Sequence, residues 1–190
     1  MKFSSREVRD LMFAWLMISI AFAVLFLDYK SISFDVILKS FLLSFFGVGT
    51  AFFLHELGHK FVAQRYGYYA EFQAFKGMLY LAVLMSFFGF IFAAPGGVLI
   101  KGRITLRKNG IISLAGPLVN IIIGIIFFVL FLLFKFNFFY FSFVINSFIG
   151  LFNLIPVFPF DGGKIIKWSK GVYFITALLA LIVFLLRFLI

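Results

Sequence analysis

Long apolar runs occupy most of the chain and predict membrane-spanning helices. Crossing the hydrocarbon core of a bilayer takes about 20 apolar residues in an α-helix. The runs that approach or exceed this length cover residues 10–27, 37–66, 111–134, 138–158 and 172–190. A further apolar stretch, 78–94, is shorter. The pattern therefore predicts an all-α polytopic membrane protein with about five transmembrane helices.

Two segments depart from the helical period. From Ile100 to Arg107, apolar and polar residues alternate, so that one side is apolar and the other carries Lys, Arg and Thr. Residues 68–75 alternate less cleanly and can pair with this segment. We expect a small membrane-associated β hairpin or sheet over about 68–75 and 97–107. The alternative is an irregular loop at the membrane interface.

The composition agrees with a membrane protein. Hydrophobic residues make up 64% of the 190 residues and charged residues only 13%, too few to cover the surface of a soluble globule. The length suits one integral-membrane domain over residues 1–190. The net charge of +10 is typical of Lys and Arg that set membrane topology, and no nucleic-acid partner is expected.

The chain has only two histidines, His55 and His59, which lie four residues apart in FFLHELGHKF with Glu56 between them. Residues i and i+4 share one helix face, so both imidazoles can bind one metal ion. Glu56 lies about 100° around the helix and can reach a metal-bound water as a general base, as in the HExxH pattern of zinc hydrolases. The alternative is two buried histidines satisfied by neighbours. Because ionisable residues inside a membrane are costly and usually functional, the pattern favours a metal site.

A catalytic zinc usually has three protein ligands, and the third must be a carboxylate here because the chain has no cysteine. Asp161 follows two prolines and precedes two glycines, a break that can turn a carboxylate inward. Glu71, soon after the histidine helix, is the runner-up. The remaining candidates are expected as solvated helix ends: Glu7, Asp10, Asp28 and Asp35.

Three motifs make the chain resemble the site-2 protease family of intramembrane zinc metalloproteases, peptidase family M50. They are HELGH (55–59), AGPLVN (115–120) and NLIPVFPFDGG (153–163), in the order of the family. PGGVLIKG (95–102) also resembles the strand that precedes AGPLVN in the family. The resemblance covers a catalytic core of about 37–170, in a compact form without room for PDZ or CBS domains.

This resemblance implies that His55, His59 and Asp161 bind one Zn²⁺ ion and that Glu56 activates water. It also implies that Asn120 and Asn153 line the cleft and hold the substrate carbonyl or the oxyanion. Hydrogen bonding between helices is the alternative role for both asparagines.

One metal site requires the histidines and Asp161 at the same membrane depth. If every apolar stretch crossed once, Asp161 would emerge on the face opposite the histidines. We therefore expect 78–94 to be re-entrant. With the N-terminus cytoplasmic, this arrangement leaves only Lys30, Lys39, Lys135 and Arg187 of the 17 Lys and Arg residues outside, as the positive-inside tendency requires.

The expected function is an intramembrane endopeptidase in the cell membrane, with its active site near the cytoplasmic side and transmembrane-helix proteins as substrates. A membrane zinc carrier or sensor with the same ligands is the alternative. A third possibility is an inactive relative that only binds membrane helices, which the intact Glu56 disfavours.

Overall fold

The computed structural model describes residues 1–91 and 95–189. Over these ranges the chain forms helices and one two-stranded sheet. In chain order the elements are α1 (Ser5–Leu25), α2 (Phe34–Arg65), β1 (Tyr69–Ala74), α3 (Lys76–Ser86), β2 (Gly96–Lys101), α4 (Leu106–Phe134), α5 (Asn137–Asn153), α6 (Asp161–Trp168), α7 (Lys170–Leu185) and the 3-10 helix η1 (Leu186–Phe188).

Four helical segments in the described ranges are long and apolar enough to cross a membrane: α1, α2, α4, and α7 together with η1. The expected fifth span is α5, which has 17 residues. This length is about 26 Å, slightly less than the ~30 Å hydrocarbon core. The all-α polytopic membrane architecture is confirmed, with a small antiparallel sheet beside the helices.

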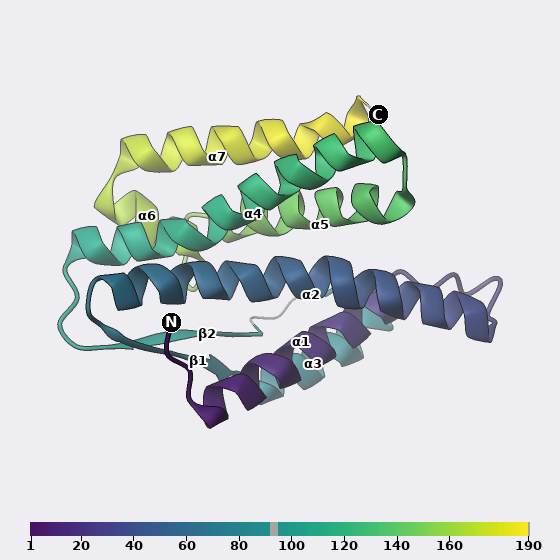
Figure 1. Ribbon diagram of the computed structural model, residues 1–190, viewed down its shortest axis with the longest axis horizontal. Helices are drawn as coiled ribbons and strands as arrows, with labels where there is room; N and C mark the ends of the chain where they lie inside the picture. Colours follow the sequence, from purple (N-terminus) through teal and green to yellow (C-terminus); the bar gives the residue numbers. More distant parts are fainter. Residues whose placement is uncertain (92–94, 190) are drawn as a thin grey trace.

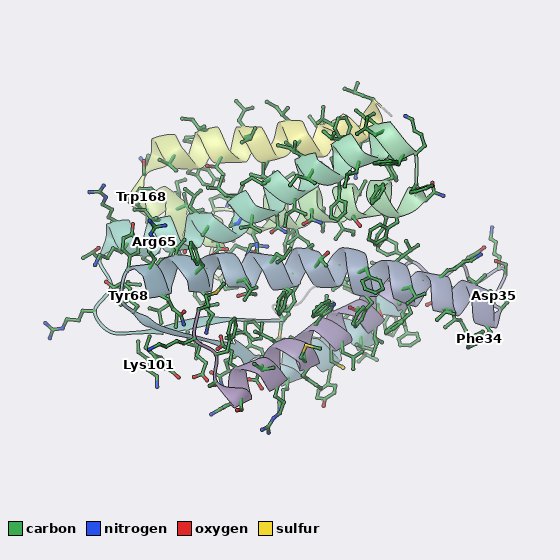
Figure 2. All side chains as sticks on the ribbon, viewed as in Figure 1. Phe34, Asp35, Arg65, Tyr68, Lys101 and Trp168 are labelled. Carbon is green, nitrogen blue, oxygen red and sulfur yellow. The ribbon has the colours of Figure 1, made fainter. Side chains whose placement is uncertain are left out.

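Helix α2 runs through the middle of the molecule, with α4, α5 and α7 on one side and α1, α3 and the sheet on the other (Figure 1). The end of α2 lies together with the start of α4, α6 and the sheet. Figure 2 marks this end by Arg65, Lys101 and Trp168, while Phe34 and Asp35 mark the opposite end.

A close contact between α1 and α2 holds the two helices together. The indole N–H of Trp15 donates to the carbonyl of Phe45 at 2.8 Å. A Cβ at Gly49 would lie only 1.6 Å from the indole nitrogen, so this position of α2 requires glycine. Buried apolar side chains surround the contact: Leu11, Ala14, Ile18, Val48, Ala51 and Phe52.

The predicted sheet forms, with β1 and β2 antiparallel and Ala70 opposite Ile100. Its second strand is shorter than expected. It ends at Lys101 because Gly102 adopts a φ of +117° and turns the chain. The predictions of a strand to residue 107 and a helix from 111 were therefore wrong. Helix α4 begins at Leu106, where the Thr105 hydroxyl caps it by accepting from Lys108 N at 3.3 Å.

The apolar stretch 78–94 does not provide a spanning helix. Its described part forms most of α3, which has 11 residues, or about 16 Å. The strands that flank it pair with each other, Ala74 opposite Gly96, so the chain returns to the place that it left. This geometry agrees with the expected re-entrant path, although residues 92–94 lie outside the described part of the chain.

Acidic side chains of α1 cover the outer edge of β1. Glu7 accepts from the backbone N–H of Phe72 at 2.9 Å, and Asp10 accepts from that of Ala74 at 3.1 Å. Lys60 of α2 donates to both carboxylate oxygens of Glu7, each at 2.6 Å. Glu7 is 1% exposed and Asp10 is 8% exposed. The expectation that these two carboxylates are solvated helix ends was therefore wrong, because they are hydrogen-bonded to a strand edge.

The segment around Asp161 also differs from expectation. The predicted helix 138–158 ends at Asn153, just before the two prolines. Asp161 is then the first residue of α6, a short helix that the apolar pattern does not predict. Gly162 is required there because a Cβ would lie 2.2 Å from the carbonyl oxygen of Leu154. The tight turn brings the start of α6 against the backbone of Leu154 and Ile155, directly after α5.

Candidate metal centre

His55, His59 and Asp161 come together in the interior of the molecule, as the sequence predicts. The Oδ2 atom of Asp161 lies 3.0 Å from His59 Nε2 and 3.3 Å from His55 Nε2. The two Nε2 atoms are 3.0 Å apart. All three residues are buried. The described residues thus contain a group of one carboxylate and two imidazoles that could hold a metal ion.

Hydrogen bonds on the far side of each ring determine which nitrogen carries the proton. His59 Nδ1 lies 2.8 Å from the backbone carbonyl of Ile112. A carbonyl can only accept, so Nδ1 carries the proton and donates. His55 Nδ1 lies 2.6 Å from Asn120 Oδ1. The Asn120 amide N–H donates to the carbonyl of Ala51 at 2.9 Å, which leaves its oxygen to accept from His55.

In the neutral form that binds a metal, both imidazoles therefore direct an Nε2 lone pair toward Asp161. In this form three acceptor atoms lie 3.0 to 3.3 Å apart. Such an arrangement is repulsive unless a cation lies among the three atoms. Tetrahedral zinc with ligands at 2.0–2.2 Å separates them by about 3.3–3.6 Å, close to the observed spacing. The donor set and its spacing fit zinc.

The other oxygen of the Asp161 carboxylate is held separately. Lys164, one turn further along α6, donates to Oδ1 at 3.1 Å. The positive charge of Lys164 stabilises the ionised carboxylate, whose Oδ2 is directed at the imidazoles.

Glu56 lies between the two histidines on α2 and is buried, 8% exposed. Its Oε2 atom accepts no hydrogen bond from any described residue. A buried carboxylate oxygen without a donor is costly unless a ligand or water satisfies it. Glu56 is thus suited to interact with a bound molecule.

Gly116 of α4 lies directly against the two imidazoles. A Cβ at this position would lie 2.4 Å from His59 Nε2 and 2.6 Å from His55 Nε2. Since any other residue would displace the rings, AGPLVN has a glycine at this point for steric reasons. This close approach also brings Ile112 and Asn120 of the same helix to the far side of each ring.

The two asparagines named by the resemblance lie in different surroundings. Asn120 is fully buried, and its amide contacts His55, Ala51 and Asn146. It is placed to orient His55 between packed helices. Asn153, the last residue of α5, donates to the carbonyl of Ile149 at 3.0 Å. A role of Asn120 or Asn153 in substrate binding stays a prediction.

Other carboxylates of the described chain do not join the group. Glu71, the runner-up ligand, accepts from the hydroxyls of Ser4 and Tyr69. These hydrogen bonds lower the pKa of Glu71. Asp28 and Asp35 are exposed, Asp28 in the connection between α1 and α2 and Asp35 in the first turn of α2, as expected for solvated helix ends.

Sequence reasoning missed three contributors to the centre. Asn146 is fully buried in α5 and accepts from Asn120 at 3.2 Å. A polar residue within an apolar helix indicates a functional or structural contact, so the sequence could have predicted a role for Asn146. Lys164 stands at i+3 from Asp161, a spacing that brings side chains together on a helix. The carbonyl of Ile112 has no sequence signal, because every residue carries a carbonyl.

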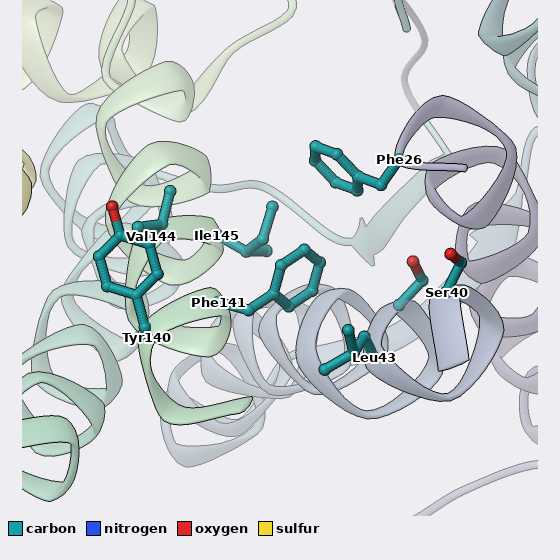
Figure 3. A pocket seen from close by; sticks show the side chains of 8 residues that line it. Phe26, Ser40, Leu43, Tyr140, Phe141, Val144 and Ile145 are labelled. Atoms are coloured by element: carbon teal, nitrogen blue, oxygen red, sulfur yellow. The ribbon is translucent and has the colours of Figure 1, made fainter. Parts of the chain in front are cut away.

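A separate pocket lies between α2 and α5, nearer the opposite end of the bundle (Figure 3). It is lined by Phe26, Ser40, Leu43, Ser44, Tyr140, Phe141, Val144 and Ile145. No histidine or carboxylate faces it, so it offers no metal ligands.

Comparison with known proteins agrees with the geometry of the centre. The family model of Peptidase family M50 matches residues 43–136 and 133–176, a range that contains both histidines and Asp161. The chain belongs to this family. The expected membership in the site-2 protease family is confirmed. This membership supports the prediction that the chain is a metallopeptidase.

Two curated relatives come from Methanocaldococcus jannaschii. The chain is 39% identical over 184 residues to "Putative zinc metalloprotease MJ0611", a match that covers 93% of this chain and 92% of that protein. It is 36% identical over 119 residues to "Zinc metalloprotease MJ0392", covering 60% of this chain and 30% of that protein. No solved structure matches the chain.

The position of Gly116 gives a test of the centre. Gly116→Ala should lower zinc affinity by about tenfold or more, because the methyl group displaces both imidazoles. Gly124→Ala is the matched control on α4, since its nearest neighbour would lie 3.5 Å away. Competition with a zinc-binding dye measures both. Equal affinity of the two variants would contradict the described contact.

Proposed function

We propose that the protein is an intramembrane zinc endopeptidase that hydrolyses peptide bonds within or near transmembrane helices of other membrane proteins. One observation carries this proposal: three acceptor atoms from α2 and α6 converge beside the unpaired carboxylate of Glu56. Membership in M50 supports the same reaction class.

His55, His59 and Asp161 would hold one Zn²⁺ ion. When bound, zinc supplies a Lewis acid and lowers the pKa of bound water toward ~7. The protein residues do the rest. Asn120 and the Ile112 carbonyl keep each imidazole in the tautomer that presents Nε2, and Lys164 keeps Asp161 directed at the histidines.

Glu56 would act as the general base. Its carboxylate takes a proton from the attacking water and later delivers it to the nitrogen of the leaving amine. A carboxylate without a hydrogen-bond donor is ready for this role because it need not first break a contact. Of the two asparagines, Asn153 is the better candidate for a substrate carbonyl, since the Asn120 amide is engaged on both sides.

The substrate must be extended for cleavage, and the sheet offers a place to hold it. The outer edge of β1 is occupied by Glu7, Asp10 and Lys60. In an antiparallel pair, residues directly opposite one another direct their backbone groups the same way, inward or outward. Val98 and Ile100 lie opposite Phe72 and Ala70. Their backbone N–H and C=O groups therefore point away from β1, toward the open edge of β2. An unwound substrate would add as a strand there.

The orientation in the membrane follows from charge. The end of the bundle that holds the metal centre also carries most of the Lys and Arg residues, so we place it on the cytoplasmic side. The N-terminus then lies in the cytoplasm.

Removal of the base tests the mechanism. Glu56→Gln should reduce cleavage of a membrane-helix substrate by about 10²–10⁴-fold, while zinc content stays at the parent value. Asp35→Asn, an exposed change on the same helix, is the control and should cut normally. A Glu56→Gln protein that binds zinc and cuts like the parent would exclude this base. A parent that binds zinc but never cuts would instead favour a zinc carrier or sensor.

Removal of one backbone donor tests strand addition. Ile100→Pro deletes an outward N–H of β2 without breaking a bond to β1. Cleavage should fall about tenfold or more with zinc content unchanged. Ile100→Ala serves as the control for the lost side chain. Loss of activity to the same degree in both variants would count against pairing at this edge.

Cysteine labelling tests the orientation, because the chain has no cysteine. A cysteine at exposed Arg107 should resist a membrane-impermeant maleimide in intact cells and react after the membrane is opened. A cysteine at Lys30, in the connection at the opposite end, should react from outside. The reverse pattern would contradict the proposed sidedness.

A further inference from the structure

Three cations from two separate elements surround one hollow away from the metal centre. Arg6 and Arg9 come from the first turns of α1, and Lys76 is the first residue of α3. Asp10, Gln73 and Ala74 complete the lining of a cavity of about 490 Å³. The hydrogen bond from Ala74 N to Asp10 at 3.1 Å joins β1 to α1 at this hollow.

The positive charge of the hollow is not neutralised within the described chain. Arg6, Arg9 and Lys76 form no salt bridge with any described carboxylate; the ion pairs of the structure lie elsewhere. Asp10 is the one carboxylate of the lining, and it is already bound to a backbone N–H. The lining carries three positive charges and one negative charge, and Arg6 also lies near enough to Glu71 to help lower the pKa of that carboxyl. The remaining excess of positive charge favours an anionic ligand.

Exposed apolar side chains continue from Arg9 along α1 and from Lys76 along α3. Arg9, Met12 and Leu16 follow the i, i+3, i+7 spacing of one face of α1, and Met12 and Leu16 are exposed. Lys76, Tyr80 and Leu84 follow the i, i+4, i+8 spacing on α3, and Tyr80 and Leu84 are exposed.

The two helices lie against each other along these faces. The rings of Phe13 and Tyr80 meet edge to face, with centroids 6.0 Å apart. Lys76 Nζ lies 5.8 Å from the centroid of the same Phe13 ring. Figure 1 shows α3 beside α1 over its length. A polar, cationic hollow thus lies at one end of an exposed apolar strip that α1 and α3 form together.

We propose that this hollow binds the phosphodiester anion of an anionic phospholipid. Arg6 and Arg9 would donate to the phosphate oxygens, Lys76 would add a third charge, and the acyl chains would lie along the exposed faces of α1 and α3. The general excess of cytoplasmic Lys and Arg explains how many cations the chain has. It does not explain why Arg6 and Arg9 of α1 line the same hollow as Lys76, which is about 70 residues away in the sequence.

Lipid binding measured by native mass spectrometry tests this site on the full-length protein in detergent. The probes are phosphatidylglycerol, phosphatidylcholine and soluble glycerol phosphate. The parent should retain phosphatidylglycerol in preference to phosphatidylcholine. The variant Arg6→Gln/Arg9→Gln/Lys76→Gln should bind phosphatidylglycerol about tenfold more weakly or worse, because each basic residue near a phosphate contributes to the attraction.

The matched control is Arg103→Gln/Arg107→Gln/Lys167→Gln, which removes the same charge from exposed positions outside the hollow. It should bind like the parent. The charge-preserving variant Arg6→Lys/Arg9→Lys/Lys76→Arg should retain most of the binding, which separates loss of charge from loss of fold.

Equal weakening of phosphatidylglycerol binding in the hollow variant and the control variant would overturn the proposal. Basic residues elsewhere on the surface would then contribute as much to lipid binding as those of the hollow. Equal retention of phosphatidylcholine and phosphatidylglycerol by the parent would also overturn it. If glycerol phosphate displaces phosphatidylglycerol at similar concentrations, the acyl chains contribute nothing and the lipid assignment fails in favour of a soluble phosphate ester.

Discussion

Two imidazole lone pairs and a carboxylate oxygen meet within 3.3 Å of one another in the interior of an apolar protein. This convergence is unfavourable by itself, because all three atoms are acceptors and little solvent reaches them. It becomes favourable only with a cation among them. Many other features of the fold, from the chain path to single glycines, are understandable as ways of bringing these three atoms together.

The chain path provides the first condition. Asp161 reaches the histidines because α2 and α5 end at the same end of the bundle, which requires the segment between β1 and β2 to return to its starting point. The second condition is close approach. Gly116 lets α4 touch both imidazoles, and Gly162 lets α6 turn back sharply after α5. Neither of these two glycine positions has room for a Cβ atom.

The sequence predicted the parts of this centre that depend on residue type and local spacing. His55, Glu56 and His59 are recognisable because i, i+4 spacing shares a helix face, and Asp161 is recognisable from its Pro–Gly break. The re-entrant path followed from the need to place these residues at one depth. The requirement that three residues bind one metal ion thus predicted the re-entrant path, which the hydrophobic pattern alone does not predict.

The failures have a common cause in tertiary contacts. Glu7 and Asp10 resemble solvated helix ends, yet they bind the edge of β1, a partner more than 60 residues away. Helix α6 has too few residues for an apolar period to reveal it. The strand prediction ran past Lys101 because alternation continued in the sequence while Gly102 turned the backbone. Periodicity in the sequence indicates the type of a helix or strand. It does not indicate the residue at which a turn or a tertiary contact ends that element.

X-ray absorption at the zinc edge tests the central claim most directly, because it reports the atoms around the metal. The zinc-loaded protein should show two imidazole ligands and a carboxylate oxygen at about 2.0–2.2 Å. In Asp161→Ala the oxygen shell should change while both imidazoles remain. A zinc shell with fewer than two imidazoles, or one that Asp161→Ala leaves unaltered, would contradict the account.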